Sequence, residues 1–415
     1  MTQRELVTLR GLEVARAVLL AAFVVGLAVS ISLSQIALTG LLIWVLLARW
    51  QGMLGPLRWP LWPPIAAFTA WSVVAALAST RPLESLVESK HLLTLGTVLI
   101  IANVLPDAAT ARKVASWLLL AVALAAAASL VQVAACPDQE VRPHATTLVG
   151  KFMRKCWRAR GFYSIYMTLA GVLAMTVTAA LPPLSRVGAH TRWLLPAWIV
   201  SLTALALTYV RGAWLGLGAG VLVVVAGLGR RGLAAAGVML ALAVALAAGL
   251  PEVRARVASI VDPANDTARD RMAMLEVGLR LTGRHPIVGI GPGQLKHIYA
   301  QEAPPEAMRR ATSHVHNTPL QIALERGLPG LAMWLWIFVA FFRRAGTILV
   351  RLPADPPGDR ALVLGSLAAL ATFMVAGLFE FNFGDTEVLL VATTLMALPF
   401  VVAAGRVSAD PCQPA

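Results

Sequence analysis

The chain has 415 residues, of which 58% are hydrophobic and 13% are charged, and it carries a formal net charge of +14. Its mean hydropathy is +0.74. Soluble globular domains contain about 25% charged residues, so this composition excludes an ordinary water-soluble protein. Backbone groups in hydrocarbon must be hydrogen-bonded within the protein, which leaves helices or a closed barrel. Long runs of Leu, Ala and Val, without the alternation of barrel strands, therefore predict an all-α polytopic membrane protein.

Apolar segments long enough for a span of about 20 residues predict about twelve transmembrane helices. Nine are expected within residues 1–250, three within 329–405, and a hydrophilic loop domain at 251–328 separates the two groups. A second span follows the first directly, so we expect the first helix to be retained rather than cleaved as a signal peptide. The twelve centres lie near Leu19, Leu41, Thr69, Gly96, Ala123, Gly171, Trp198, Gly218, Ala241, Trp336, Leu370 and Ala392.

Basic residues predict the orientation, because Lys and Arg in short loops mark the cytoplasmic side. With the N-terminus in the cytoplasm, each turn on that side is basic, for example at Arg49, Lys113 and Arg231. An even number of spans returns the C-terminal tail, residues 406–415, to the same side.

Two loops on the opposite face are also basic, although orientation does not require it. One is the long loop of residues 251–327, and the other covers residues 136–160. Their charge fits either anionic lipid headgroups or a phosphorylated substrate, and we favour the substrate. The shorter loop contains two acidic residues, Asp138 and Glu140, and six basic ones. The basic residues are Arg142, Lys151, Arg154, Lys155, Arg158 and Arg160.

Cys136 and Cys156 share the shorter loop. On an oxidising face they would form a disulfide that holds the loop arginines in place, or they are two unpaired cysteines, and the spacing does not decide. No Cys or His grouping has zinc-ligand spacing, so we expect no metal site.

The long loop contains an expected amphipathic helix at Asp270–Leu281, because Met274, Val277 and Leu281 recur at helical spacing. It would lie against the membrane or the helical bundle, with Arg271 in its first turn. The helix dipole opposes a cation there, which favours either a nearby anion or, more commonly, an exposed and solvated arginine. The following G-x-G-x-G run, residues 289–293, lacks the dinucleotide or P-loop spacing and predicts a structural turn.

His316 and Asn317 precede a second expected helix. Thr318 followed by Pro319 predicts its start, with Thr318 as N-cap, and Gly327 predicts its end. A helix N-terminus favours a neutral imidazole, the form that a general base requires. His314 is a weaker candidate. It lies two residues from His316, so the two histidines would not share a helix face or chelate one metal.

Arg211 lies between two apolar runs at the outer boundary. With Tyr209 and Trp214 it fits an interfacial belt that reaches the headgroups. Because Gly212 permits close approach and arginine binds phosphate in a bidentate manner, Arg211 is also a phosphate-binding candidate.

The segment His316-Asn317, nine residues and then Gly327-Leu328-Pro329-Gly330 resembles the H-[NSQ]-x9-G-x-x-[GTY] pattern of bacterial O-antigen ligases. That family is related to O-antigen polymerases and protein O-oligosaccharyltransferases. The stretches around Arg211 (VRGAWLG), around Arg271 and at HPIVGIGPGQL are also similar to that group. The layout of twelve spans, with a long loop between the ninth and tenth, resembles the family as well. Relatives often have Trp soon after the loop arginine, where this chain has Met274-Leu275.

The resemblance implies a GT-C-like glycosyltransferase of the bacterial inner membrane with a periplasmic active site. It implies transfer of O-antigen from undecaprenyl pyrophosphate to a sugar hydroxyl of lipid A–core, with inversion and without metal, ATP or other cofactor. His316 would be the general base and Asn317 would orient the base or the sugar. Arg211, Arg271 and, less strongly, Arg160 would bind the pyrophosphate, with His314 and Arg142 as weaker candidates.

Three other functions remain open. An O-antigen polymerase would use the same donor with a donor-linked chain as acceptor, and a protein O-oligosaccharyltransferase would use Ser or Thr of a protein. A flippase for lipid-linked oligosaccharides would place charges or broken helices at mid-membrane. The charges here gather in outside loops, which counts against transport. Membrane lipids are expected partners and nucleic acid is not.

Overall fold

The computed structural model describes residues 3–136, 148–153, 156–185, 191–249, 266–353 and 357–407, and this part of the chain is helical without a β-strand. Arg142 and residues 250–265 of the long loop lie outside the described residues. The helices are α1 (Gln3–Val29), α2 (Ile31–Trp50), α3 (Trp62–Leu77), α4 (Pro82–Glu88), η1 (Ser89–Gly96), α5 (Thr97–Val104), α6 (Ala108–Ala134), α7 (Leu148–Met153), α8 (Tyr166–Leu184), η2 (Arg192–Leu194), α9 (Leu195–Leu207), α10 (Arg211–Leu228), α11 (Arg230–Gly249), α13 (Asp266–Arg284), α14 (Leu295–Glu302), α15 (Thr318–Arg351), α16 (Pro357–Ala376), η3 (Asn382–Gly384) and α17 (Thr386–Val407).

Nine helical segments in the described residues are long and apolar enough to cross a membrane, so the chain is a multi-pass membrane protein, as predicted. They contain nine of the twelve predicted centres. The other three centres, Thr69, Trp198 and Ala241, fall in α3, α9 and α11. Of these, α3 and α9 belong to shorter apolar helices. A count of twelve spans and a GT-C-like arrangement therefore stay predictions.

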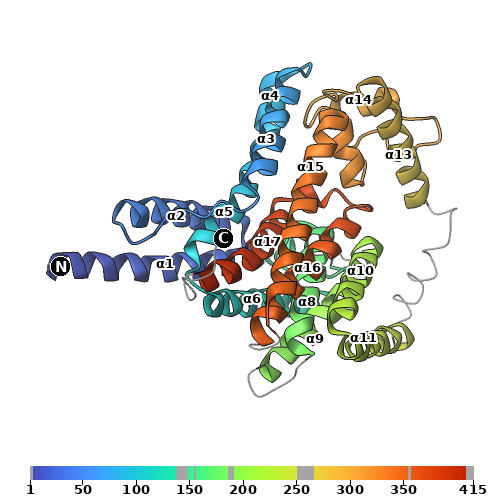
Figure 1. Cartoon of the computed structure of the whole chain (residues 1–415). Helices are drawn as coiled ribbons and strands as arrows, with labels where there is room; N and C mark the ends of the chain where they lie inside the picture. Colours follow the sequence, from blue (N-terminus) through green and yellow to red (C-terminus); the bar gives the residue numbers. More distant parts are fainter. Residues whose placement is uncertain are drawn as a thin grey trace.

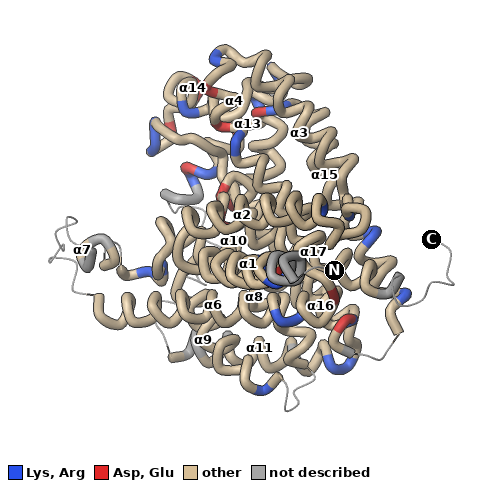
Figure 2. Tube along the Cα trace, turned by 90° about the vertical axis from the view of Figure 1, so that its left-hand side faces the viewer, with Lys and Arg blue, Asp and Glu red and all other residues tan. Residues whose placement is uncertain are grey.

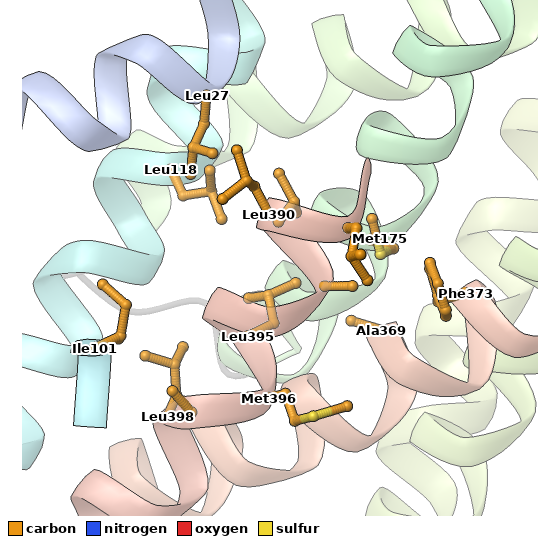
Figure 3. Packing of buried hydrophobic residues seen from close by; sticks show 14 of the residues in the cluster. Leu27, Ile101, Leu118, Met175, Ala369, Phe373, Leu390, Leu395, Met396 and Leu398 are labelled. Carbon is orange, nitrogen blue, oxygen red and sulfur yellow. The ribbon is translucent and has the colours of Figure 1, made fainter. Parts of the chain in front are cut away.

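The helix α17 lies at the centre of the core. It contacts α1, α5, α6, α8 and α16. Figure 3 shows its Leu390 and Leu395 among Leu118 of α6 and Met175 of α8. In contrast, only 33% of the apolar stretch of α1, and likewise of α2, is buried inside the protein. These two helices project from the body (Figure 1). Their outward apolar side chains, such as Val18 and Ile36, suit lipid.

Close packing of α10 against α16 positions the outer end of α10. Lipid tails are as apolar as leucine, so helices in a membrane associate by tight packing, and small residues permit it. A Cβ added to Gly212 would lie 2.7 Å from Cβ of Phe379, and one added to Gly216 would lie 2.6 Å from the carbonyl oxygen of Thr372. Gly212 therefore permits close approach of the chain that follows α16, and α10 begins directly beside that segment.

The helix α15 is broken at Gly327, as the sequence predicts, but a second helical stretch follows at once. Gly327 has φ 68° and ψ −179°. A Cβ there would lie 1.9 Å from the carbonyl oxygen of Ile287. The glycine run of residues 289–293 packs on this break. Ile290 and Gly291 donate backbone hydrogen bonds to Leu324 and Glu325 (2.9 and 3.0 Å). The predicted structural turn is thus confirmed, and it braces the broken helix.

The helices α13 and α14 form a small layer over the first turns of α15, with a core of Met274, Val277, Leu281, Leu295, Tyr299, Val315, Leu320 and Leu324. The predicted amphipathic helix is confirmed, and its apolar face packs on protein. It begins at Asp266, so the expected position of Arg271 in the first turn is wrong. The argument from the helix dipole does not apply to Arg271.

Charged residues of both signs gather at the end of the molecule that holds α4, α13 and α14, and further Lys and Arg residues lie near α11 and α16 at the opposite edge (Figure 2). Glu84 and Glu88 of α4 both accept from Lys296 of α14 (2.9 and 2.7 Å), and Glu84 also contacts His297 (2.8 Å). Ion pairs therefore connect the α3–α4 arm to the layer formed by α13 and α14, which is named here the loop layer.

Candidate active site

A cationic cavity of about 110 Å³ lies where the loop layer meets the helical body. Four guanidinium groups line it, against the carboxyl groups of Asp270 and Glu380, and His316 lies on its wall. Clustered arginines suit a polyanionic group such as a diphosphate. The four are Arg158, Arg211, Arg271 and Arg309. The structure thus brings together three residues predicted from the sequence: Arg211, Arg271 and His316.

His316 is held by its backbone and by a carboxylate. Its φ is 51°, a left-handed conformation that is uncommon for a residue with a side chain. Its Nδ1 lies 2.8 Å from Oε2 of Glu380, and the two side chains are each 13% exposed. The carboxylate accepts a hydrogen bond from Nδ1–H, so the lone pair of the neutral ring is on Nε2. Such an imidazole can take up a proton at Nε2.

Asn317 is the N-cap of α15, so the predicted N-cap at Thr318 is wrong. The Asn317 side chain accepts a hydrogen bond from the backbone N–H of Leu320 (2.9 Å) and donates one to the carbonyl of Leu378 (3.0 Å). The Thr318 hydroxyl instead donates to the carbonyl of Glu380 (2.8 Å). Asn317 and Thr318 therefore fasten the histidine segment to the chain around Glu380.

Glu380 is a residue that the sequence reasoning missed. It follows α16 and bridges two site residues, because its Oε1 lies 2.5 Å from Nη2 of Arg271 while Oε2 contacts His316. The available signal was an acidic residue between two apolar segments, LFEFNFGD, since ionisable residues at such positions are functional candidates.

Arg158 and Arg309 were also absent from the predicted site. Arg158 lies 4.4 Å above the ring of Tyr166. The predicted alternative of a Cys136–Cys156 disulfide is the one that the structure has, with Cα atoms 5.4 Å apart, and it closes the loop two residues before Arg158. Asp270 accepts backbone hydrogen bonds from Met308 and Arg309 (2.9 and 3.0 Å), which holds the second arginine in place.

Arg160, in contrast, does not line the cavity. Its guanidinium donates to the carbonyl oxygens of Phe152 and Tyr163 (3.0 and 2.8 Å), so it braces its own loop. Arg142 lies outside the described residues. Among the described residues, no group of three or more His, Cys, Asp or Glu side chains is arranged to hold a metal ion.

A second cavity of about 320 Å³ adjoins the cationic one, and Met167 and Glu380 line both. His314 faces this second cavity, with its ring centroid 4.4 Å from that of His316. Burial, with a smaller contribution from the charge of His316, lowers the pKa of His314 to about 4. The histidine is therefore neutral near pH 7.

The fold and the cationic cavity define a multi-pass membrane protein with a site suited to a phosphorylated ligand. Residues 196–335 match the family model described as O-Antigen ligase. This match supports the family resemblance for that part of the chain, and the matched segment contains Arg211, Arg271, His316, Asn317 and Gly327. Members of this family are glycosyltransferase-like ligases or polymerases.

No curated protein matches the chain. A solved structure described as "Structural coordination of polymerization and crosslinking by a peptidoglycan synthase complex" contains a chain that is 20% identical, with a TM-score of 0.45. The similarity covers 86% of this chain and 99% of that one.

Proposed function

We propose that the protein is an O-antigen ligase of the bacterial inner membrane, with both termini cytoplasmic and a periplasmic site to which the loop domain of residues 251–328 contributes Arg271 and His316. It transfers a finished glycan from undecaprenyl pyrophosphate to a sugar hydroxyl of lipid A–core. The observation that carries the proposal is the His316–Glu380 pair on the wall of a cavity lined by four arginines.

The arginines are proposed to bind the donor pyrophosphate. Arginine offers paired N–H donors that match phosphate oxygens. Charge grows on the pyrophosphate as the glycosidic bond breaks, so fixed cations stabilise the transition state more than the bound donor. Arg271 is oriented by Glu380, and Arg211 lies at the first position of α10.

The polyprenyl tail of the donor would follow α10 into the bilayer. Leu215 and Leu222 follow Arg211 by four and eleven residues, which puts the three on one side of the helix. Their side chains are 45% and 70% exposed. A lipid anchored at Arg211 by its pyrophosphate could therefore lay its chain along an apolar, unburied face.

His316 is the proposed general base. The acceptor hydroxyl oxygen attacks the anomeric carbon from the side opposite the pyrophosphate, and the new C–O bond forms with inversion. The bond from the anomeric carbon to the pyrophosphate oxygen breaks, and its electron pair leaves with the undecaprenyl pyrophosphate. The hydroxyl proton passes to Nε2 of His316, and Glu380 stabilises the resulting imidazolium. Asn317 is a positioning residue that acts through the start of α15.

The test is a reconstituted transfer assay with undecaprenyl-pyrophosphate-linked O-antigen and lipid A–core, without ATP. His316→Ala should lower kcat by about 10²–10⁴-fold, the usual contribution of a general base. His285→Ala is the matched control, because His285 is an exposed histidine of the same loop layer. Retained transfer by His316→Ala would remove that residue as the base. Glycan extension in donor-only vesicles would indicate a polymerase, and translocation without transfer would indicate a flippase.

Arginine variants test the donor site. Arg271→Ala should raise the donor KM at least tenfold, because a charge-assisted contact contributes about 1.5–3 kcal/mol. Arg269→Ala is the control, since Arg269 is exposed on the same helix and does not line the cationic cavity. Equal donor kinetics in the two variants would contradict the proposed pyrophosphate site.

A further inference from the structure

We infer that the cavity of about 320 Å³, named here the acceptor cavity, binds the acceptor sugar that carries the attacking hydroxyl, and that it selects an unphosphorylated sugar. This inference rests on the proposed function and adds the place and chemical class of the acceptor. Its lining residues come from the end of α4 and the η1 segment, the start of α8, the loop layer, α15, and the chain from Glu380 into α17.

The position of the acceptor cavity suits a second substrate. It shares Met167 and Glu380 with the cationic cavity, and His314 on its wall packs against His316. A sugar in the acceptor cavity therefore lies on the other side of the histidine pair from the donor pyrophosphate. His316 lines the cationic cavity and His314 lines the acceptor cavity, so the two substrates would meet at the histidine pair, as a transfer reaction requires.

The two cavities differ in their charged lining groups, although three carboxyl groups of the acceptor cavity are in ion pairs: Glu88 with Lys296, Glu325 with Arg326 and Glu380 with Arg271. The acceptor cavity is lined by four carboxyl side chains and one ammonium group, that of Lys296. Carboxylates accept hydrogen bonds from sugar hydroxyls and repel phosphate, so they favour a sugar and disfavour a phosphorylated one. The carboxyl groups belong to Glu88, Glu325, Glu380 and Asp385. Apolar side chains on the same wall, including Phe381 and Val388, suit the C–H faces of a pyranose ring.

Glu325 is held rigidly at the wall of the acceptor cavity. Its Oε1 accepts from the backbone N–H of Gly293 (3.0 Å) and from Nε2 of Gln321 (2.8 Å). Its Oε2 accepts from Nη1 of Arg326 (2.5 Å), whose side chain is fully buried. A carboxylate fixed by three donors is already oriented before the ligand arrives, which lowers the entropic cost of binding.

His91 offers an unpaired hydrogen-bond group. Its Nδ1 lies 2.7 Å from the carbonyl oxygen of Glu88, so Nδ1 carries the proton and Nε2 is an acceptor. The Nε2 atom is buried and has no hydrogen-bond partner in the described part of the chain. A buried polar atom without a partner is costly. His91 lines the acceptor cavity, so a small movement of the side chains that cover Nε2 would let a sugar hydroxyl pair with it.

The first test measures both substrates in the reconstituted assay. His91→Ala should raise the acceptor KM about tenfold and leave the donor KM unchanged. Arg271→Ala should raise the donor KM and leave the acceptor KM unchanged. Ser313→Leu provides a second variant, because Ser313 is exposed at the rim and a larger side chain there narrows the cavity without disturbing the core. Unchanged acceptor KM in both variants, or a change in donor KM instead, would overturn the inference while leaving the transferase intact.

The second test does not depend on transfer. The probe is delipidated core oligosaccharide, native and enzymatically dephosphorylated, titrated onto the full chain in nanodiscs by calorimetry. Both His91→Ala and Ser313→Leu should weaken binding, and Arg271→Ala should not. The dephosphorylated probe should bind at least as tightly as the native one to the wild type. Glu88→Gln should narrow any difference in affinity between the two probes, whereas Glu276→Gln, at an exposed side chain outside the acceptor cavity, should not. Such binding without any transfer would refute the ligase and keep the sugar site, and no binding of either probe would refute the site.

Discussion

Oε2 of Glu380 lies 2.8 Å from Nδ1 of His316, although 64 positions of sequence separate the two residues. The same carboxylate reaches Arg271 with its other oxygen. The Glu380 side chain therefore orients both the proposed base, His316, and one of the arginines proposed to bind pyrophosphate, Arg271. In the proposed mechanism, this shared carboxylate couples proton transfer to donor binding.

Replacement of Glu380 by Gln should impair both steps. An amide keeps the shape of the side chain but cannot stabilise an imidazolium or pair with Arg271, so kcat should fall about 100-fold and the donor KM should rise. Steady-state kinetics in proteoliposomes, with both substrates varied, measures the two effects. Glu276→Gln, at a side chain that is 62% exposed on α13, should retain normal kinetics. A Glu380→Gln enzyme with normal kcat would remove the carboxylate from the mechanism.

Loss of the Cys136–Cys156 disulfide should weaken donor binding through Arg158. The disulfide closes the loop two residues before this arginine, so its removal frees the loop that carries it. The double variant Cys136→Ser/Cys156→Ser should show a several-fold higher donor KM, and Arg158→Ala should show a similar change. The two effects should not add, since both act on the same guanidinium. Additive effects in the combined variant would show that the disulfide acts elsewhere.

Gly327→Ala should destabilise the protein by at least about 3 kcal/mol, because the residue would be strained and its Cβ would overlap Ile287. The positive φ and the 1.9 Å approach leave no room for a side chain. Gly346→Ala in the same helix is the matched control, since nothing lies near a Cβ at that position. It should be neutral or stabilise the helix by up to about 1 kcal/mol. Thermal unfolding in detergent compares the two, and equal unfolding temperatures would refute the argument.

His314 should make stability depend on pH below 6.5. Its pKa is about 4 in the folded protein, lowered from 6.5 by burial. Between pH 6.5 and 4 the unfolded chain binds more protons at this histidine than the folded protein does. Stability is therefore lost as the pH falls from about 6.5 to 4. His314→Gln should lose less stability over that window. Unfolding temperatures measured at pH 7, 5.5 and 4.5 test the difference, and identical pH dependence would show that His314 does not cause it.

The sequence by itself determined the membrane class, the helical segments and the break at Gly327. These follow from local patterns, because apolar runs, glycine and charge act over one helix length. It also singled out Arg211, Arg271 and His316, which lie in short motifs. The loop helix was predicted too, but its first turn was placed too late for Arg271.

Only the tertiary structure decided which polar residues meet. Glu380, Arg158 and Arg309 reach the cationic cavity from three separate segments, and no local pattern pairs them with His316. The Arg160 guanidinium donates hydrogen bonds to backbone carbonyls of its own loop, whereas Arg158, two residues earlier, lines the cationic cavity. The physical reason is that side-chain convergence depends on how distant helices pack, whereas the choice between helix and loop depends on neighbours in sequence.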